Sequence, residues 1–441
     1  MVNTVKRKAI LFILDGFRTD YVFRVRRSKI REMAEKGAGP RYAWSIFPSM
    51  THPAHTSIIT GLYPQAHGCF SQHYLDVQRG VKRDPTCYNR YRGSPLPELL
   101  KKMNGKTVSI EEFTCIGKCD LYINIPSHSV EEIVYYAKTV LRREKPDLLI
   151  ITFFITDDIG TLYGPESNKI AEAIREVDDA INEVIDYAEE AWKKSSKLYI
   201  ITSDHGMTYA GNNVRRNIEE TIETADFLHE GHYTHVYLRG RRIPNKICLS
   251  TLIKGVDVVF EKEELGFLNN YDPYMGDFTI SLKEGYNTYG SNVKHRGVHG
   301  GFTDDEMQVP LIIYGDYVKE GASLRFAEIV DVAPTLAAFF GFNGSFDGRP
   351  LAEAFTVDEE RRLEILKETA FLDMAYRKIR TTLRKLSEIK GMLARNEIIR
   401  REYYAFKRNL NSSVRKLKNE FDARKQALKK LGFELLREKT S

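Results

Sequence analysis

Short runs of apolar residues recur along the first three quarters of the chain, with helix-like segments between them. Such runs, rich in Ile, Val, Leu and Phe, are typical of strands buried on both faces of a mostly parallel sheet. The runs lie at 9–16, 106–110, 147–154, 197–204 and 309–316. Residues 167–194 place apolar side chains at three- and four-residue spacing, which predicts an amphipathic helix. This alternation predicts an α/β fold with a doubly wound, mostly parallel sheet and helices on both faces.

The pattern loosens between residues 206 and 298, where short polar and aromatic segments replace the long apolar runs. We interpret this stretch as a smaller inserted subdomain, or cap, beside the ends of the predicted strands. Loops and inserts in that position often select the substrate. The catalytic domain as a whole is predicted to cover residues 1–351.

The last part of the chain has a different character. After Pro350 there is no further proline, and the only glycines are Gly391 and Gly432. Apolar residues follow helical spacing over 372–393 and again over 414–435, while residues 409–413 are polar and typical of a cap or turn. We predict a tail at 357–441 that forms a helical hairpin or coiled coil.

Charge is unevenly distributed between these parts. The whole chain carries a formal net charge of +6, but residues 376–441 contain 20 Lys and Arg against 7 Asp and Glu. That segment therefore carries +13 and the remainder −7. A basic tail of this kind binds nucleic acid through phosphate contacts, docks on the acidic body, or forms a homo-oligomer through its apolar stripes. The charge pattern alone leaves all three open.

The location of the protein is predicted from what the sequence lacks. No apolar run approaches the roughly 18 residues of a membrane span. The basic and apolar start lacks a small-residue cleavage site, so we interpret it as the first strand and predict a cytoplasmic protein. The five cysteines are odd in number and show no repeated spacing, so no disulfide framework is expected.

Three acidic residues stand where predicted strands end. Asp15, Asp157 and Asp204 each follow or close an apolar run. Ligands of open α/β sheets bind at the carboxyl ends of the strands. These acids are therefore candidates for a functional site rather than ordinary loop residues.

Hydrolysis of a phosphodiester requires an activated nucleophile, a stabilised leaving oxygen and neutralised charge on the phosphoryl group. Two divalent ions held by carboxylates and imidazoles, together with a hydroxyl nucleophile, supply these needs. The chain contains such a set. Its members, in chain order, are Asp15, Thr51, Asp157, Asp204, His205 and His299.

Five segments of the chain resemble, in order, the motifs of the nucleotide pyrophosphatase/phosphodiesterase family of the alkaline phosphatase superfamily. They are ILDGFRTDY (13–21), FPSMTHPAHTSIITGLYPQAHG (47–68), TSDHGM (202–207), HRGVHGGFTDDEMQVPLIIYG (295–315) and IVDVAPTLAAFFGF followed by DGRPL (329–351). The second segment is similar to the family's nucleophile motif, with Thr51 at the nucleophile position. The resemblance covers roughly residues 7–351 and implies an alkaline-phosphatase-like fold.

The resemblance also implies roles for individual residues. One metal ion would be held by Asp15, Asp204, His205 and the Thr51 oxygen. The second would be held by Asp157 and His299. Thr51 would attack phosphorus and form a phosphothreonine that water then hydrolyses, and Gln72 aligns with a residue that contacts the phosphoryl group.

The chain departs from the family pattern at one ligand of the second ion. Thr161 stands where the family has a histidine, four residues after Asp157. A neutral hydroxyl is a poorer ligand for zinc than an imidazole. Asp158 or water would then complete the site. We therefore expect two divalent ions, Zn or Mn, with a weak second site that favours a harder ion such as Mn²⁺ or Mg²⁺.

These observations predict a metal-dependent hydrolase of phosphodiester or pyrophosphate bonds that acts on nucleotides or other small phosphodiesters. Two alternatives remain open. The same core supports a phosphonate or phosphomonoester hydrolase. A catalytically impaired member would instead act as a binding module that presents its helical tail to a partner.

Overall fold

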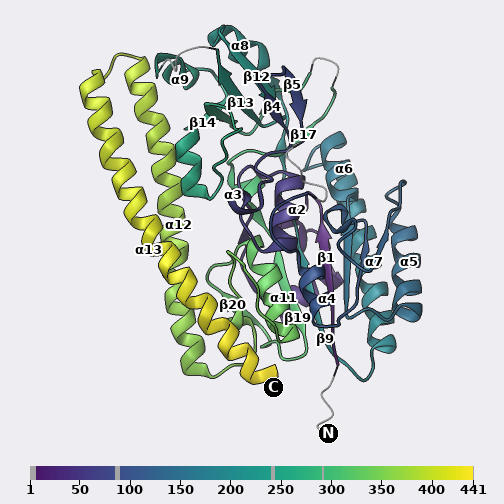
Figure 1. Ribbon diagram of the computed structural model, residues 1–441. Helices are drawn as coiled ribbons and strands as arrows, with labels where there is room; N and C mark the ends of the chain where they lie inside the picture. Colours follow the sequence, from purple (N-terminus) through teal and green to yellow (C-terminus); the bar gives the residue numbers. More distant parts are fainter. Residues whose placement is uncertain (1–5, 85–89, 240–243, 291–292, 441) are drawn as a thin grey trace.

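The computed structural model describes residues 6–84, 90–239, 244–290 and 293–440 and is built around an eight-stranded sheet (Figure 1). The strand order is β20-β2-β19-β9-β1-β8-β6-β7. Five neighbouring strands, from β9 to β7, are parallel, whereas β19 runs antiparallel to both β9 and β2. All five apolar runs are strands of this sheet, as predicted. Their bounds and those of the other members are β1 (Arg7–Leu14), β2 (Ala38–Pro40), β6 (Thr107–Ile110), β7 (Leu121–Ile123), β8 (Leu148–Phe153), β9 (Ser196–Thr202), β19 (Leu311–Gly315) and β20 (Ala322–Leu324).

Helices cover both faces of the sheet because its central strands are apolar on both sides. In β1, Ile10 and Phe12 pack on one face and Leu11 and Ile13 on the other. The first face is covered by α1 (Lys29–Lys36), α5 (Val130–Arg143) and α7 (Asn168–Ala191), and the second by α2 (Thr51–Thr60), α4 (Leu96–Lys102) and α11 (Val332–Phe340). The predicted doubly wound α/β fold is confirmed.

The region between His205 and His299 contains a second, smaller sheet with its own apolar core around Ile218, Val236 and Phe278. Its strand order is β12-β13-β15-β14, and neighbouring strands are antiparallel. The elements are α8 (Arg215–Thr221), β12 (Ala225–His229), β13 (Tyr233–Leu238), α9 (Pro244–Ser250), β14 (Val256–Glu261) and β15 (Phe278–Leu282). The predicted inserted subdomain is therefore present, while the division of the chain near residue 351 stays a prediction.

Shorter elements connect these parts. They are β3 (Ala43–Trp44), α3 (Pro64–His67), β4 (Tyr74–Asp76), β5 (Val81–Arg83), α6 (Ile155–Tyr163), β10 (Thr208–Tyr209), β11 (Asn212–Asn213), β16 (Tyr286–Asn287), β17 (Gly297–Val298), α10 (Asp304–Met307) and β18 (Gln308–Val309). Segments of 3₁₀ helix lie at Thr19–Phe23, Phe113–Cys115, Lys262–Leu268, Ile329–Asp331 and Ala352–Ala354.

The tail forms two long helices that lie side by side, α12 (Glu359–Ala394) and α13 (Arg400–Thr440) (Figure 1). The helical hairpin is confirmed, but the predicted turn at 409–413 is wrong. Those residues lie inside α13, where the Ser413 hydroxyl donates to the carbonyl of Asn409 at 2.9 Å and so fits the helix. The chain reverses earlier, near Asn396, which has a left-handed φ of 59°.

The tail docks on the body, which confirms one of the three interpretations of its charge. Apolar residues of both helices share a core with one face of the main sheet. Basic side chains of the tail form ion pairs with acidic residues of the body: Lys425 with Glu328, Lys390 with Glu264 and Arg380 with Asp304. The apolar stripes therefore face the protein's own interior.

Two further findings concern the cysteines and the membrane. Cys69 is disulfide-bonded, so a disulfide is present although no disulfide framework was expected. Cys115, Cys119 and Cys248 are free, and Cys87 lies outside the described residues. Within the described ranges, no helix has both the length and the apolar character that a membrane crossing requires.

Candidate active site

The three acids predicted at strand ends come together at one edge of the main sheet. Asp15 follows β1, Asp204 follows β9, and Asp157 lies in the first turn of α6, just after β8. Strand β1 lies between β8 and β9, and all three are parallel. Their carboxyl ends therefore meet, and Gly16 lies so close to Asp157 that a Cβ at Gly16 would come within 2.9 Å of the Asp157 Cα.

Thr51 is the first residue of α2, next to this edge. Its Oγ1 lies 3.2 Å from Nε2 of His205. The other ring nitrogen of His205, Nδ1, lies 2.9 Å from the Gly206 carbonyl and must donate to it. Nε2 is then the acceptor, so the Thr51 hydroxyl donates to it. The position at a helix N-terminus also gives Thr51 a site where negative charge is stabilised.

The first candidate ligand group consists of Asp15, Asp204 and His205. His205 Nε2 lies 3.4 Å from Asp15 and 3.1 Å from Asp204, and all three side chains are buried. Burial and the neighbouring Asp204 raise the pKa of Asp15 well above its usual range. Burial also acts to raise the pKa of Asp204, but His205 and His55 outweigh it, and the net shift is downward. A positive charge nearby would stabilise two buried carboxyl groups that lie this close together.

The second candidate group consists of Asp157, His205 and His299. His299 Nε2 lies 3.6 Å from Asp157, and its Nδ1 lies 3.3 Å from the Ser49 carbonyl, to which it donates. Its Nε2 lone pair therefore faces Asp157. The rings of His205 and His299 are stacked, with centroids 3.7 Å apart. The two groups are thus neighbours that meet at His205.

Several polar atoms of these groups are buried and have no hydrogen-bond partner among the described residues. They include Oδ1 of Asp15, Oδ2 of Asp204 and Oδ1 of Asp157. Burying a carboxylate without a partner is costly, and a divalent cation removes that cost. Carboxylate oxygens and imidazole nitrogens are also the donors that catalytic zinc and manganese sites use. The residues present therefore fit bound divalent ions.

The two additional candidates near the second group differ in their placement. Thr161 lies one turn beyond Asp157 on α6, and its Oγ1 is buried without a partner in the described part of the chain. Asp158 belongs to neither ligand group. Its carboxylate lies 3.9 Å from His128, and its side chain is more than half exposed. Of the two, only Thr161 has its polar atom enclosed in the protein.

A comparison with protein families identifies the family of this chain. The model of type I phosphodiesterases/nucleotide pyrophosphatases matches residues 9–130 and 127–301. The chain belongs to this family. The resemblance read from the five motifs is thereby confirmed.

Curated relatives agree with this assignment, and solved structures share the fold. An uncharacterized pyrophosphatase/phosphodiesterase of Schizosaccharomyces pombe is 26% identical over 48% of this chain, which spans about half (47%) of that protein's length. Bis(5'-adenosyl)-triphosphatase enpp4 of Xenopus laevis is 24% identical, over 78% of this chain and 79% of its own. Murine ectonucleotide pyrophosphatase/phosphodiesterase 5 has a TM-score of 0.67 at 17% identity, covering 77% of this chain and 98% of its own. A further structure of that murine protein is an inactive threonine-to-alanine variant in complex with AMP.

Gln72 lies next to the nucleophile motif of this family. Its Oε1 accepts a long hydrogen bond, 3.5 Å, from the backbone N–H of His52, the residue after Thr51. Its own backbone N–H donates to the hydroxyl of Tyr233 in the inserted subdomain. The structure thus brings Gln72 to the N-terminus of α2, and its role in binding substrate stays a prediction.

His55 is a residue of the site that is absent from the set predicted from the sequence. Its Nε2 lies 3.5 Å from Asp15 and 3.4 Å from Asp204. Its Nδ1 lies 2.6 Å from Glu112, which also accepts hydrogen bonds from Thr114 and Thr152. The signal was in the sequence: His55 lies four residues after Thr51 on α2, one helical turn away on the same face.

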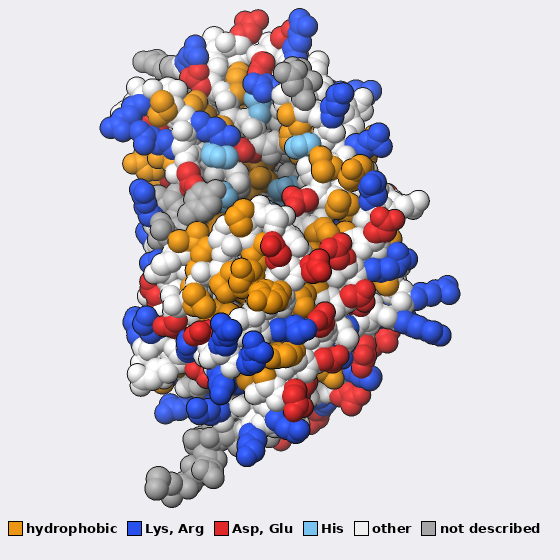
Figure 2. All heavy atoms as spheres, turned by 90° about the vertical axis from the view of Figure 1, so that its right-hand side faces the viewer, with side chains coloured by type: hydrophobic (Ala, Val, Ile, Leu, Met, Phe, Trp, Pro, Cys, Tyr) orange, Lys and Arg blue, Asp and Glu red, His pale blue; other side chains and the backbone are white. Residues whose placement is uncertain are grey.

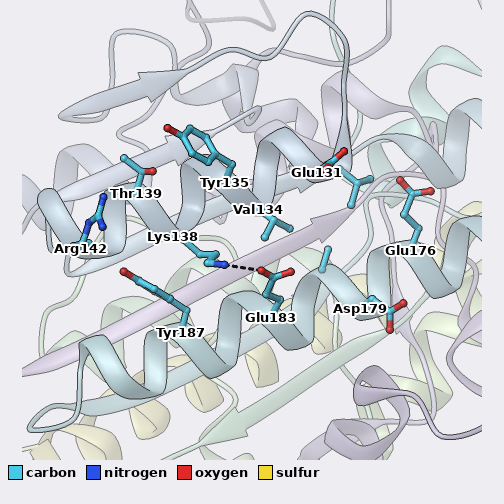
Figure 3. Close-up of a pocket in the computed structure, with 12 residues that line it drawn as sticks. Glu131, Val134, Tyr135, Lys138, Thr139, Arg142, Glu176, Asp179, Glu183 and Tyr187 are labelled. Carbon is cyan, nitrogen blue, oxygen red and sulfur yellow. Dashed lines mark hydrogen bonds and ion pairs between the residues drawn. The ribbon is translucent and has the colours of Figure 1, made fainter.

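A groove elsewhere on the molecule is unrelated to these residues. It measures about 540 Å³ and runs between α5 and α7, where Lys138 and Glu183 form an ion pair of 2.6 Å (Figure 3). None of the candidate site residues lines it. On the same side of the molecule, histidine side chains gather in a hollow in the upper half of the view (Figure 2).

Proposed function

We propose that this chain hydrolyses phosphodiester or pyrophosphate bonds of nucleotide-type substrates through a phosphothreonine at Thr51. One observation carries the proposal. The Thr51 hydroxyl stands at the N-terminus of α2, 3.2 Å from His205, beside a buried cluster of carboxylates with unpaired oxygens. A hydroxyl in that place is surrounded by groups suited to hold divalent ions.

The ligand groups divide between two such ions. Asp15, Asp204, His205 and the Thr51 oxygen would hold one, and Asp157 with His299 the other. When bound, the ions lower the pKa of a hydroxyl and neutralise charge on a phosphoryl group.

The chain's own residues then carry the reaction. The Thr51 hydroxyl loses its proton to solvent and its oxygen attacks phosphorus. As this bond forms, the bond from phosphorus to the leaving oxygen breaks, and the leaving oxygen takes up a proton from water. The backbone N–H of Thr51 and the positive end of α2 would stabilise the charge of the phosphoryl oxygens. Gln72, placed beside the His52 amide, donates its side-chain N–H to the same group. Water then attacks the phosphothreonine and regenerates the Thr51 hydroxyl.

The relatives support the substrate class. One curated relative is a bis(5'-adenosyl)-triphosphatase, and a threonine-to-alanine variant of a structural neighbour is inactive and binds AMP. The first points to nucleotides joined through phosphate bonds, and the second to a nucleotide ligand. The alternative of a phosphomonoester or phosphonate hydrolase uses the same core and is separated by assay.

The test measures turnover of bis(p-nitrophenyl) phosphate and p-nitrophenyl phosphate with Zn²⁺, Mn²⁺ or Mg²⁺. We expect diester turnover to exceed monoester turnover, and Thr51→Ala to lose it by at least about 1,000-fold. Thr56→Ala, a buried threonine on the same helix, is the matched control and retains turnover. Faster monoester turnover would favour the alternative. Absence of turnover with every metal would favour the binding module.

The partners and the location of the protein form a separate part of the proposal. We propose that the tail stabilises the catalytic body, because its basic and apolar side chains are engaged there. Nucleic-acid binding and homo-oligomer formation rest on charge and spacing alone. The cytoplasmic location stays a prediction, and the disulfide at Cys69 argues against it because such bonds persist mainly in oxidising compartments.

A further inference from the structure

The second ligand group lacks one imidazole that its family relatives would have. Thr161 occupies that position, and its buried Oγ1 has no partner among the described residues. It lies one turn from Asp157 on the same face of α6. This face of α6 therefore presents one carboxylate and one hydroxyl to the site, and a further ligand has to come from another element.

Strand β17 passes directly along this face of α6. The backbone N–H of Arg296 donates to the carbonyl of Thr161 at 2.8 Å. At Gly297 the approach is closer still, because a Cβ there would come within 2.3 Å of the Gly160 carbonyl oxygen and 2.5 Å of Met207 Sδ. The strand's other neighbour is β10, with Tyr209 opposite Gly297. The segment is thus held between α6 and β10.

The contacts of this segment show where its residues lie. The side-chain position of Gly297 faces α6, because a Cβ there would meet the Gly160 carbonyl oxygen. His299, two residues further on, reaches Asp157 at 3.6 Å. The chain bends at Arg296, whose Cβ lies near Gly164 at the end of α6. His295 directly precedes the residue whose N–H bonds the Thr161 carbonyl, so its backbone lies beside the last turn of α6.

His295 has an unengaged ring nitrogen. Its Nδ1 is buried and has no hydrogen-bond partner within the described residues. The ring packs edge-on against Tyr289, with centroids 4.9 Å apart, and the Tyr289 hydroxyl donates to the Gly297 carbonyl. Burial lowers the pKa of His295, and the nearby Asp157 and His299 act on it in opposite directions. The imidazole therefore lies within the electrostatic influence of both ligands, and its Nδ1 is not engaged by any described residue.

We propose that His295 supplies to the second divalent ion the imidazole that Thr161 cannot. This inference rests on the proposed two-ion function. His295 is not part of the tight group formed by Asp157, His205 and His299, so its ring turns about its side-chain torsions when the ion binds. Asp158, the other candidate, faces His128 instead. Asp157, His299 and His295 together form the two-imidazole, one-carboxylate set of catalytic zinc sites, which favours zinc over a harder ion.

The test counts metal ions rather than activity. Wild type, His295→Ala, Asp158→Ala and the control His229→Ala are stripped with EDTA and titrated with Zn²⁺ by calorimetry. Bound zinc is then counted by elemental analysis. His229 is a histidine of the inserted subdomain that hydrogen-bonds Thr234 and Glu219. We expect about two ions per chain in wild type, Asp158→Ala and His229→Ala, and about one in His295→Ala, with the weaker site loosened at least about 100-fold.

A rescue variant removes the ambiguity of a folding defect. Thr161→His combined with His295→Ala should recover the second ion, because the imidazole then returns from α6. If His295→Ala keeps both ions with unchanged affinity, or if Asp158→Ala loses one, the assignment of His295 is wrong. If wild type itself binds fewer than two ions, the two-ion premise of the proposed function fails instead.

Discussion

Glu112 holds His55 by a hydrogen bond of 2.6 Å, and both side chains are fully buried. Glu112 is itself fixed by Thr114 and Thr152, so the imidazole has one orientation. In that orientation Nε2 of His55 lies between the carboxylates of Asp15 and Asp204. His55 therefore helps to position Asp15 and Asp204, two candidate metal ligands.

We expect Glu112→Gln to weaken metal binding by roughly 10- to 100-fold, the range found when an outer partner of a metal ligand is removed. The reason is that a neutral amide no longer favours the charged imidazole that faces both carboxylates. Zinc titration measures the effect. Glu111→Gln is the matched control, since Glu111 is also buried but bonds Ile125 instead of His55. Equal losses in both variants would contradict the positioning role.

Gly16 is required for two separate reasons, which a matched pair of variants distinguishes. It has a φ of +66°, and an added Cβ would come within 2.9 Å of Asp157. Gly80 has a φ of +65° but no atom near its added Cβ. Gly80→Ala should cost about 1–2 kcal/mol in the free energy of unfolding, from backbone strain alone. Gly16→Ala should cost more and also reduce the number of bound zinc ions, as chemical denaturation and elemental analysis would show.

The docking of the tail depends on a buried lysine. Lys425 donates to the Tyr63 hydroxyl at 2.7 Å and pairs with Glu328, and all of these groups are buried. Lys425→Met leaves Glu328 charged and without its lysine, so we expect a loss of about 3–5 kcal/mol in the free energy of unfolding. The exposed Lys416→Met should change it by less than about 0.5 kcal/mol. Similar unfolding midpoints for the two variants would refute the buried pair as a stabilising contact.

A buried histidine–glutamate pair predicts how stability depends on pH. His232 Nδ1 lies 2.8 Å from Glu306, and its Nε2 donates to the Lys283 carbonyl. Burial acts to lower the pKa of His232, but Glu306 outweighs it and the net shift is upward from 6.5. Burial acts to raise the pKa of Glu306, but His232 outweighs it and the net shift is downward from 4.5.

The sign of the effect follows from these two directions. The stabilisation from His232 is complete below pH 6.5 and is lost as pH rises through its folded pKa. The stabilisation from Glu306 is complete above pH 4.5 and is lost as pH falls through its folded pKa. The difference in unfolding free energy between wild type and Glu306→Gln should therefore be largest between these values. The exposed Glu284→Gln should show no such maximum.

The ligand cluster was predictable because strand register converts sequence into position. In neighbouring parallel strands, Ile13 lies opposite Thr202 and Leu14 opposite Phe153, so the residues that follow them reach the same edge. The periodic apolar positions also predicted both tail helices. These patterns depend on residues that are close together in the sequence. They were sufficient to predict the main sheet and the helical hairpin.

The parts that were not predicted depend on contacts between distant segments or on a competition between local conformations. The tail turns at Asn396 rather than at 409–413, because polar side chains such as Ser413 bond within the helix they were expected to end. The role of His55 depends on Glu112, which comes from another part of the chain. The nearness of His295 to α6 depends on two glycines, Gly160 and Gly297, whose contact no sequence spacing records.

The buried Lys425 has a consequence for how the protein is made. Its partners, Tyr63 and Glu328, belong to the body that the ribosome releases first, whereas Lys425 itself lies in the second half of α13 and emerges later. A growing chain that has not yet reached this helix exposes the apolar face that the tail covers. During synthesis the body therefore depends on the tail, or on a chaperone, to prevent that apolar face from associating with other chains.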